Sequence, residues 1–109
     1  MTDKRIVLST AGSVEEARKI ARYLVENQLA ACVNIVPQIE SIYRWQGKIE
    51  SSHEFLMLIK TSADQFAAVR DAISKLHSYE LPECIALAIE DGSSDYLDWL
   101  GDSLGGDAE

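Results

Sequence analysis

The sequence predicts an α+β fold in which the elements follow the order β-α-β-β-α-β, with one more helix at the carboxyl end. Three observations support this prediction. Two long runs rich in β-branched residues flank a short glycine turn within residues 29–61, two segments carry apolar residues at helical spacing, and two short apolar runs flank the whole pattern. A chain of 109 residues forms one domain, so residues 1–109 are expected to share a single core.

The two runs within residues 29–61 are predicted to form a β-hairpin that turns at Gly47-Lys48. Arms of about fifteen residues are long, because strands average five or six. Such a hairpin extends past its own subunit and leaves an edge that needs cover, which indicates a partner subunit. The apolar positions change parity between Ile39 and Ile42, which predicts a bulge in the first arm, and Pro37 indicates a bend or an edge position.

Two helices are predicted from capping boxes followed by apolar residues at helical spacing. The first begins at Ser13, with Glu16 as the reciprocal cap, and ends near Asn27. The second begins at Ser62, with Gln65 in the same role, and ends before the segment 77–83. The apolar faces consist of Val14, Ala17, Ile20, Ala21, Leu24 and Val25 in the first helix and of Phe66, Val69, Ile73 and Leu76 in the second.

The outer strands are predicted from short apolar runs at residues 5–9 and 84–89. The second of these runs is apolar throughout, as expected for a strand covered on both faces. Asp91-Gly92 then turns the chain, and Ser93 or Ser94 can cap a last short helix. Residues 105–109 are expected to form a loose acidic tail.

This order of elements is the ferredoxin-like βαββαβ sandwich. Right-handed crossovers then give an antiparallel sheet in the order 4-1-3-2, with both helices on one face. Cys32 and Cys84 fall on opposite edges of that sheet, too far apart for a disulfide within one subunit. Since both lie in apolar runs, we expect unreactive core thiols.

The formal charge of −8 disfavours a nucleic-acid partner, because a phosphate backbone would be repelled, while cations would be attracted. No run approaches the roughly 18 apolar residues of a membrane span, so no membrane partner is expected. The first apolar run is too short for a signal peptide. We therefore expect a cytoplasmic protein.

Four segments together resemble the CutA divalent-cation-tolerance family. They are the run Leu29-Ala-Ala-Cys-Val-Asn-Ile35, residues 41–50 (Ser-Ile-Tyr-Arg-Trp-Gln-Gly-Lys-Ile-Glu), residues 77–83 (His-Ser-Tyr-Glu-Leu-Pro-Glu) and residues 96–100 (Tyr-Leu-Asp-Trp-Leu). The resemblance implies a ferredoxin-like subunit in a homotrimer similar to the PII signalling trimers. It also implies a link to copper and other divalent cations.

The chain departs from the family pattern at several positions. Arg44 and Ser78 stand where the family usually has tryptophan and proline. Some members linked to copper place a cysteine at the end of strand one and a His-His pair before the tyrosine. Here those positions hold Ser9, Leu76 and His77, so one such ligand remains and any bound Cu(II) or other divalent cation is expected to be weakly held.

His77 is the candidate metal ligand, with a structural role at the end of a helix as the alternative. His53 is expected to be a solvated hairpin residue. A cleft between subunits is predicted from aromatic and charged side chains on the hairpin and the segment 77–83, with a role of the same aromatic residues as interface anchors as the alternative. The cleft candidates are Tyr43, Trp45, Glu54, Lys60, Tyr79, Glu80 and Glu83.

No nucleophile-base pattern, phosphate-binding glycine loop or Cys-x-x-Cys motif occurs in the sequence, so an enzyme is not expected. The predicted function is that of a CutA-like homotrimer associated with divalent-cation tolerance, which binds a metal or a small ligand between subunits. Two alternatives remain at this point: a PII-like sensor of a small metabolite or anion, and a structural trimer that anchors another protein.

Overall fold

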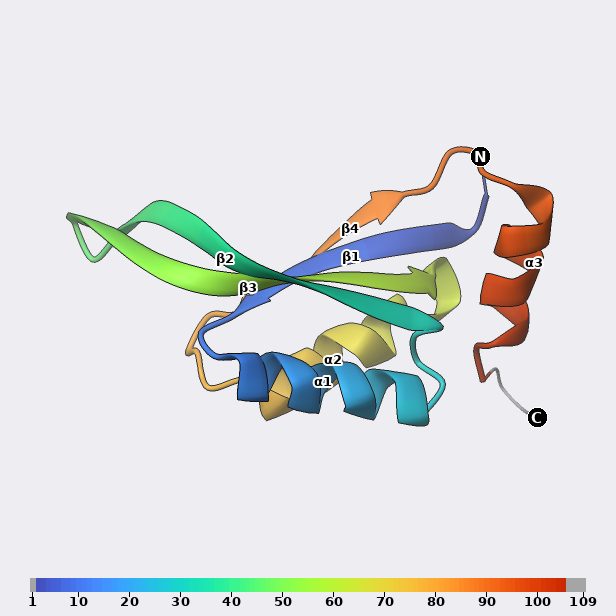
Figure 1. The fold of residues 1–109 in the computed structure, drawn as a ribbon, viewed down its shortest axis with the longest axis horizontal. Coiled ribbons are helices and arrows are strands. Elements are labelled where there is room, and N and C mark those ends of the chain that lie inside the picture. The colour runs from blue at the N-terminus through green and yellow to red at the C-terminus, as the bar shows by residue number, and fades with distance from the viewer. Residues whose placement is uncertain (1, 106–109) are drawn as a thin grey trace.

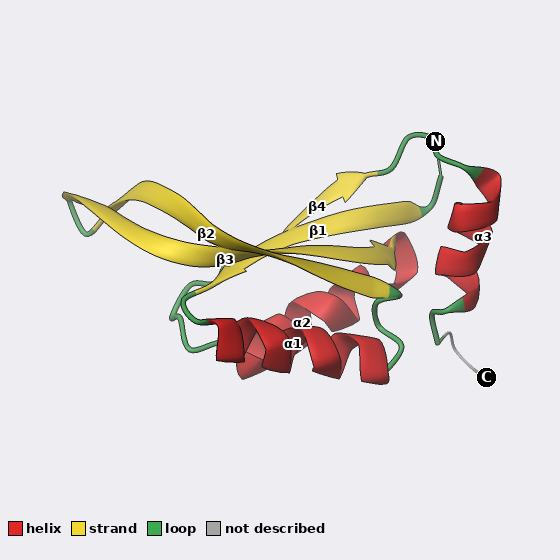
Figure 2. Cartoon of the chain, viewed as in Figure 1, coloured by secondary structure: helices red, strands yellow, loops and turns green. Residues whose placement is uncertain are grey.

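The computed structural model describes residues 2–105, which contain a four-stranded antiparallel sheet and three helices. Both central helices lie on one face of the sheet, while the third helix stands at one end of it (Figure 1, Figure 2). The elements are β1 (Lys4–Ala11), α1 (Val14–Glu26), β2 (Cys32–Trp45), β3 (Lys48–Ser62), α2 (Phe66–Leu76), β4 (Ile85–Ala88) and α3 (Ser94–Asp102). The strand order β2-β3-β1-β4 confirms the predicted 4-1-3-2 sheet.

The core lies between the sheet and helices α1 and α2. Alternate residues of β1 and β3 face the helices, because successive side chains of a strand point to opposite faces. Val7 and Ile59 are register partners, and both are fully buried. They pack in one cluster with Ile20, Leu24, Met57, Val69 and Ile73.

The hairpin β2–β3 carries the chain well past the helices, and the described part of the protein measures 45 × 26 × 22 Å (Figure 1). The predicted turn at Gly47-Lys48 is one residue too late, because Lys48 already pairs with Trp45. The turn residues are Gln46 and Gly47, with φ of 50° and 81°. Positive φ at both positions is the geometry of tight hairpin turns, whose twist matches that of the strands.

One of the two capping boxes forms in part and the other does not form. Ser13 Oγ accepts a hydrogen bond from the Glu16 backbone N–H at 3.1 Å, but the Glu16 carboxylate bonds Ser78 instead of closing the box. Ser62 makes no side-chain cap, because it is the last residue of β3 and pairs with Lys4. A 3₁₀ turn at Ala63–Gln65 follows, so α2 begins at Phe66.

The last strand differs from the prediction in length and in burial. β4 spans Ile85–Ala88 and is an edge strand paired only with β1. All four residues are exposed in the single chain, because none of them packs into the core cluster. Cys84 therefore precedes the strand. Cys32 and Cys84 are both free and half-buried, and burial raises the pKa of the Cys84 thiol, which disfavours the reactive thiolate.

The carboxyl-terminal helix begins as predicted, with Ser93 Oγ accepting from the Tyr96 backbone N–H at 3.5 Å. Gly105 is not loose, because its N–H donates to the Gln28 carbonyl at 2.9 Å. The rest of the predicted tail, residues 106–109, lies outside the described residues. Within residues 2–105, no helix has the length and apolar character needed to cross a membrane.

Candidate binding cleft

A β-bulge in β2 decides which hairpin side chains share a face. Val36 pairs with Leu56 and Ile39 pairs with Glu54, so Pro37 and Gln38 together oppose one residue of β3. Gln38 takes up the extra length with a φ of 61°. The extra residue reverses the parity of β2, because side chains alternate between the faces of a strand.

The bulge lies between Val36 and Ile39, just before the interval from Ile39 to Ile42 in which the sequence predicted it. It determines which side chains face the candidate site. Beyond it, the odd-numbered residues of β2 share a face with the even-numbered residues of β3. Tyr43 and Trp45 thereby lie on the same face as Glu54, which is the sheet face opposite α1 and α2. Without the bulge, these aromatic side chains would point the other way.

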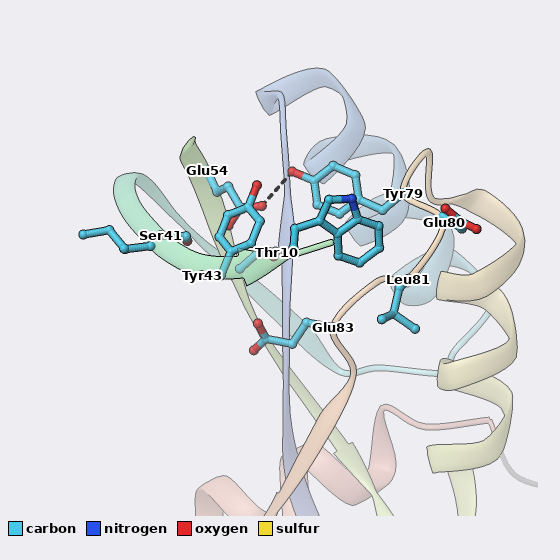
Figure 3. A pocket seen from close by; sticks show the side chains of 10 residues that line it. Thr10, Ser41, Tyr43, Glu54, Tyr79, Glu80, Leu81 and Glu83 are labelled. Atoms are coloured by element: carbon cyan, nitrogen blue, oxygen red, sulfur yellow. Dashed lines mark hydrogen bonds between the residues drawn. The ribbon is translucent and has the colours of Figure 1, made fainter. Parts of the chain in front are cut away.

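This face contains a cavity of about 630 Å³ beside the hairpin (Figure 3). Six of the seven predicted cleft residues line it: Tyr43, Trp45, Glu54, Tyr79, Glu80 and Glu83. Sequence reasoning missed four others: Thr10, Ser41, Ile42 and Leu81. Ser41 could have been predicted from the sequence, because it lies two residues before Tyr43 on the same strand and therefore shares a face with Tyr43 and Trp45.

Two of the predicted cleft residues in the cavity wall are joined by a hydrogen bond. Tyr79 Oη donates to Glu54 Oε2 at 2.6 Å (Figure 3). Burial raises the pKa of Tyr79, and the hydrogen bond to Glu54 raises it further, so the phenol keeps its proton and acts as a donor at neutral pH. Gly12 makes room for the ring, because a Cβ at that position would lie 3.1 Å from Tyr79 Oη.

His77 does not line the cavity. Its side chain is fully buried, with Nε2 at 2.6 Å from the Thr10 carbonyl and Nδ1 at 3.0 Å from the Tyr79 backbone N–H. The carbonyl requires a proton on Nε2, which leaves Nδ1 as the acceptor. Since both ring nitrogens are engaged, His77 cannot bind a metal without losing one of these bonds. The geometry favours the structural alternative, in which His77 positions Tyr79.

Glu16 supports this arrangement from helix α1. Its carboxylate accepts from the Ser78 backbone N–H at 2.7 Å and from Ser78 Oγ at 3.1 Å. Burial raises the pKa of Glu16, but the hydrogen bonds from Ser78 outweigh burial and bring the pKa below its ordinary value. The carboxylate therefore stays ionised and fixes the turn between His77 and Tyr79.

Lys60 is not part of the cavity either. It pairs with Cys32 near the opposite end of β3, and its ammonium group donates to Asn34 Oδ1. His53 is exposed on the hairpin, as expected. In residues 2–105, no three His, Cys, Asp or Glu side chains lie close enough together to form a preformed metal site.

The fold and the cavity together define a class of protein: a ferredoxin-like α+β sandwich with an extended hairpin and an acidic, aromatic cavity beside it. Residues 5–103 match the family model described as "CutA1 divalent ion tolerance protein". The chain belongs to this family.

Individual relatives agree with this assignment. The divalent-cation tolerance protein CutA of Thermus thermophilus is 48% identical over 102 residues, which cover 94% of this chain and 99% of the relative. A solved structure from that organism matches with a TM-score of 0.92, 48% identity and the same coverage. The structure of CutA from Xylella fastidiosa also has a TM-score of 0.92, at 41% identity over 94% of this chain and 99% of that one.

Proposed function

We propose that this chain functions as a homotrimer that binds a divalent cation or a small ligand in a cleft completed between subunits, without catalysing a reaction. The observation that carries the proposal is the buried carboxylate of Glu54, which lines the cavity and is held in place by Tyr79. The family description names tolerance of divalent ions and no reaction.

Assembly is supported by the sheet face that α1 and α2 leave open. Ile85 and Leu87 on the edge strand β4 remain 51% and 48% exposed. β2 and β4 are the edges of the sheet and each offers unpaired backbone groups to another chain. A second copy that covers this face would bury both the apolar side chains and an edge. The number of three subunits comes from the resemblance to the CutA family.

Weak metal binding is the expectation for the isolated cleft. Glu54, Glu80 and Glu83 offer oxygen ligands, whereas the tightest copper sites use nitrogen or sulfur. A neighbouring subunit can supply further ligands. We expect micromolar or weaker affinity for Cu(II) at neutral pH.

The test combines light scattering with calorimetric titration. Light scattering should return three times the subunit mass of 12.1 kDa, and a monomer mass would contradict the proposal. Titrations with Cu(II), Zn(II) and Mn(II) should be weakened by Glu54→Gln, with His77→Ala as the comparison that tests direct ligation by the imidazole. Nanomolar copper affinity that survives both substitutions would place the metal elsewhere.

A cytoplasmic location is also proposed, from the sequence alone. One relative, from Archaeoglobus fulgidus, is described as periplasmic. Cell fractionation with antibodies against this chain should find it in the cytoplasmic fraction, and recovery from the periplasmic fraction would contradict this proposal.

A further inference from the structure

Glu54 is a buried carboxylate that lacks a cationic partner. The residue is 6% exposed, and its hydrogen bond from Tyr79 Oη occupies one of its two oxygens. No lysine, arginine or histidine within residues 2–105 forms an ion pair with it. A buried charge is costly unless it is paired, so this side chain favours a positive group in the cavity.

The other lining residues add to the same preference. Glu80 and Glu83 bring the number of carboxylates in the lining to three, and none of the described lining residues is basic. Lys48, the register partner of Trp45, does not line the cavity. The lining therefore presents three carboxylates and no cationic side chain to balance them.

The aromatic side chains favour an organic ammonium ion over a bare divalent metal ion. Tyr43, Trp45 and Tyr79 line the cavity, and aromatic faces attract alkylammonium groups and pack against their methylene chains. A bare divalent ion gains little from such walls and needs several ligands close together, whereas no three His, Cys, Asp or Glu side chains of residues 2–105 gather in that way. The volume of about 630 Å³ lies in the range of small-molecule sites, far above that of a metal ion.

From this combination, we propose that the cleft binds a small organic cation of the aliphatic diamine or polyamine class. This inference rests on the proposed function and names the ligand class of the same site. One ammonium group donates to Glu54, a second is held by Glu83, and the aliphatic chain lies against the aromatic side chains. An anionic metabolite is disfavoured by the same three carboxylates.

The test uses the intrinsic fluorescence of Trp45 in the full chain, with Trp99→Phe as the background. Trp99 lies on α3 and does not line the cavity, so its removal leaves Trp45 as the reporter. The probe is 1,4-diaminobutane. 1,4-Butanediol and succinate serve as neutral and anionic controls of matched length. We expect the diamine to bind at least tenfold more tightly than either control.

Charge substitutions then locate the site. Glu54→Gln should weaken diamine binding at least tenfold, whereas Glu26→Gln, which removes the same charge from an exposed position of α1, should change it less than twofold. If Glu54→Gln does not fold, judged by circular dichroism, Glu83→Gln provides the test with an expected loss of at least threefold. Equal binding of diamine and diol, or equal effects of the cavity and control substitutions, would overturn the inference.

These results are distinguishable from failure of the proposed function. A trimer that binds divalent metal through Glu54 but not the diamine retains the proposed function and refutes this inference. A protein that binds the diamine through Glu54 but no metal supports the inference and removes the metal from the proposed function. A protein that binds neither the metal nor the diamine refutes both the proposed function and this inference.

Discussion

The two faces of the sheet are built from the same strands, yet they have different environments. On the face covered by α1 and α2, Val7, Met57 and Ile59 are fully buried. On the open face, the neighbouring residues Leu8, Leu56 and Leu58 are equally apolar but only partly buried, and Leu87 is half exposed. A solvated face of an antiparallel sheet normally alternates to polar residues. Its apolar character here supports the proposed assembly, in which another subunit covers this face.

The open face also changes character along its length. Its centre carries leucines and isoleucines, while the end beside the hairpin carries Thr10, Glu54 and the aromatic residues beyond the bulge. The candidate cleft therefore lies at the margin of the apolar surface. A ligand there would sit beside the proposed subunit interface, so binding and assembly are expected to affect each other.

The largest effect on stability is expected when a buried side chain of the covered face is shortened. Ile59→Ala should lower the free energy of unfolding by about 2–5 kcal/mol, since the side chain is fully buried. Ile49→Ala is the matched control, on the same strand but 64% exposed near the hairpin turn, with an expected change within about 0.5 kcal/mol. Urea denaturation at fixed subunit concentration measures both. Similar losses in the two variants would show that the hairpin is as tightly packed as the core.

A charge on the open face tests whether another subunit covers it. Leu87→Asp should raise the dissociation constant of the assembly at least 100-fold, about 2.7 kcal/mol, because a buried unpaired charge opposes association. Tyr23→Asp, at a residue 42% exposed on α1, should leave the assembly unchanged. Light scattering over a dilution series measures both. An assembly that tolerates Leu87→Asp contradicts the proposed interface.

The polar end of the open face is tested by removing one hydroxyl. Tyr79→Phe leaves the buried Glu54 without its hydrogen bond and should cost about 1.5–3 kcal/mol of stability. Tyr23→Phe on the helix surface should have no measurable effect. Thermal and urea unfolding followed by circular dichroism provide the values. A loss below about 0.5 kcal/mol for Tyr79→Phe would mean that water replaces the phenol without cost.

Removal of two hydroxyls in the covered layer should affect stability differently. Ser9 Oγ is buried and has no hydrogen-bond partner in residues 2–105, whereas Thr61 Oγ1 donates to the Leu29 carbonyl at 2.7 Å. Ser9→Ala should therefore be neutral or stabilise by about 1 kcal/mol, while Thr61→Val should destabilise by about 1 kcal/mol. Urea midpoints of the two variants give the comparison. A marked loss in Ser9→Ala would reveal a partner for that hydroxyl.

The smallest effect concerns the pH dependence of the Glu16 contact. The pKa of Glu16 lies below its ordinary value in the folded state, because hydrogen bonds from Ser78 outweigh the cost of burial. A depressed pKa contributes stability that is present above the ordinary pKa and is lost as the pH falls through the folded value. Glu16→Gln should flatten the acid limb of the stability curve. Parallel curves for the two proteins would contradict the role of this carboxylate.

Much of the architecture follows from local sequence patterns. Helical spacing of apolar residues located α1 and α2, and the cap at Ser13 formed because a serine hydroxyl can reach a free helix N–H in its own turn. The order of elements and the right-handed crossovers led to the observed strand order. These features depend on neighbours in sequence or on general chirality, so no long-range contact had to be known. Six of the seven cleft candidates were reached from residue type, as aromatic and charged side chains on the hairpin and the segment 77–83.

The remaining features depended on contacts between residues far apart in sequence. Ser62 has the sequence of a cap, but its pairing with Lys4 places it in the sheet. Glu16 bonds Ser78 rather than its own helix end, and the bulge at Pro37-Gln38 determines that Tyr43 and Trp45 share a face with Glu54. Sequence reasoning placed Lys60 in the cleft and made His77 the candidate metal ligand. However, β3 carries Lys60 away from the cavity, and two hydrogen bonds hold His77 behind it. The sequence alone therefore determined which elements form, whereas strand register and long-range hydrogen bonds, which follow only from the packed chain, decided which side chains meet in the cavity.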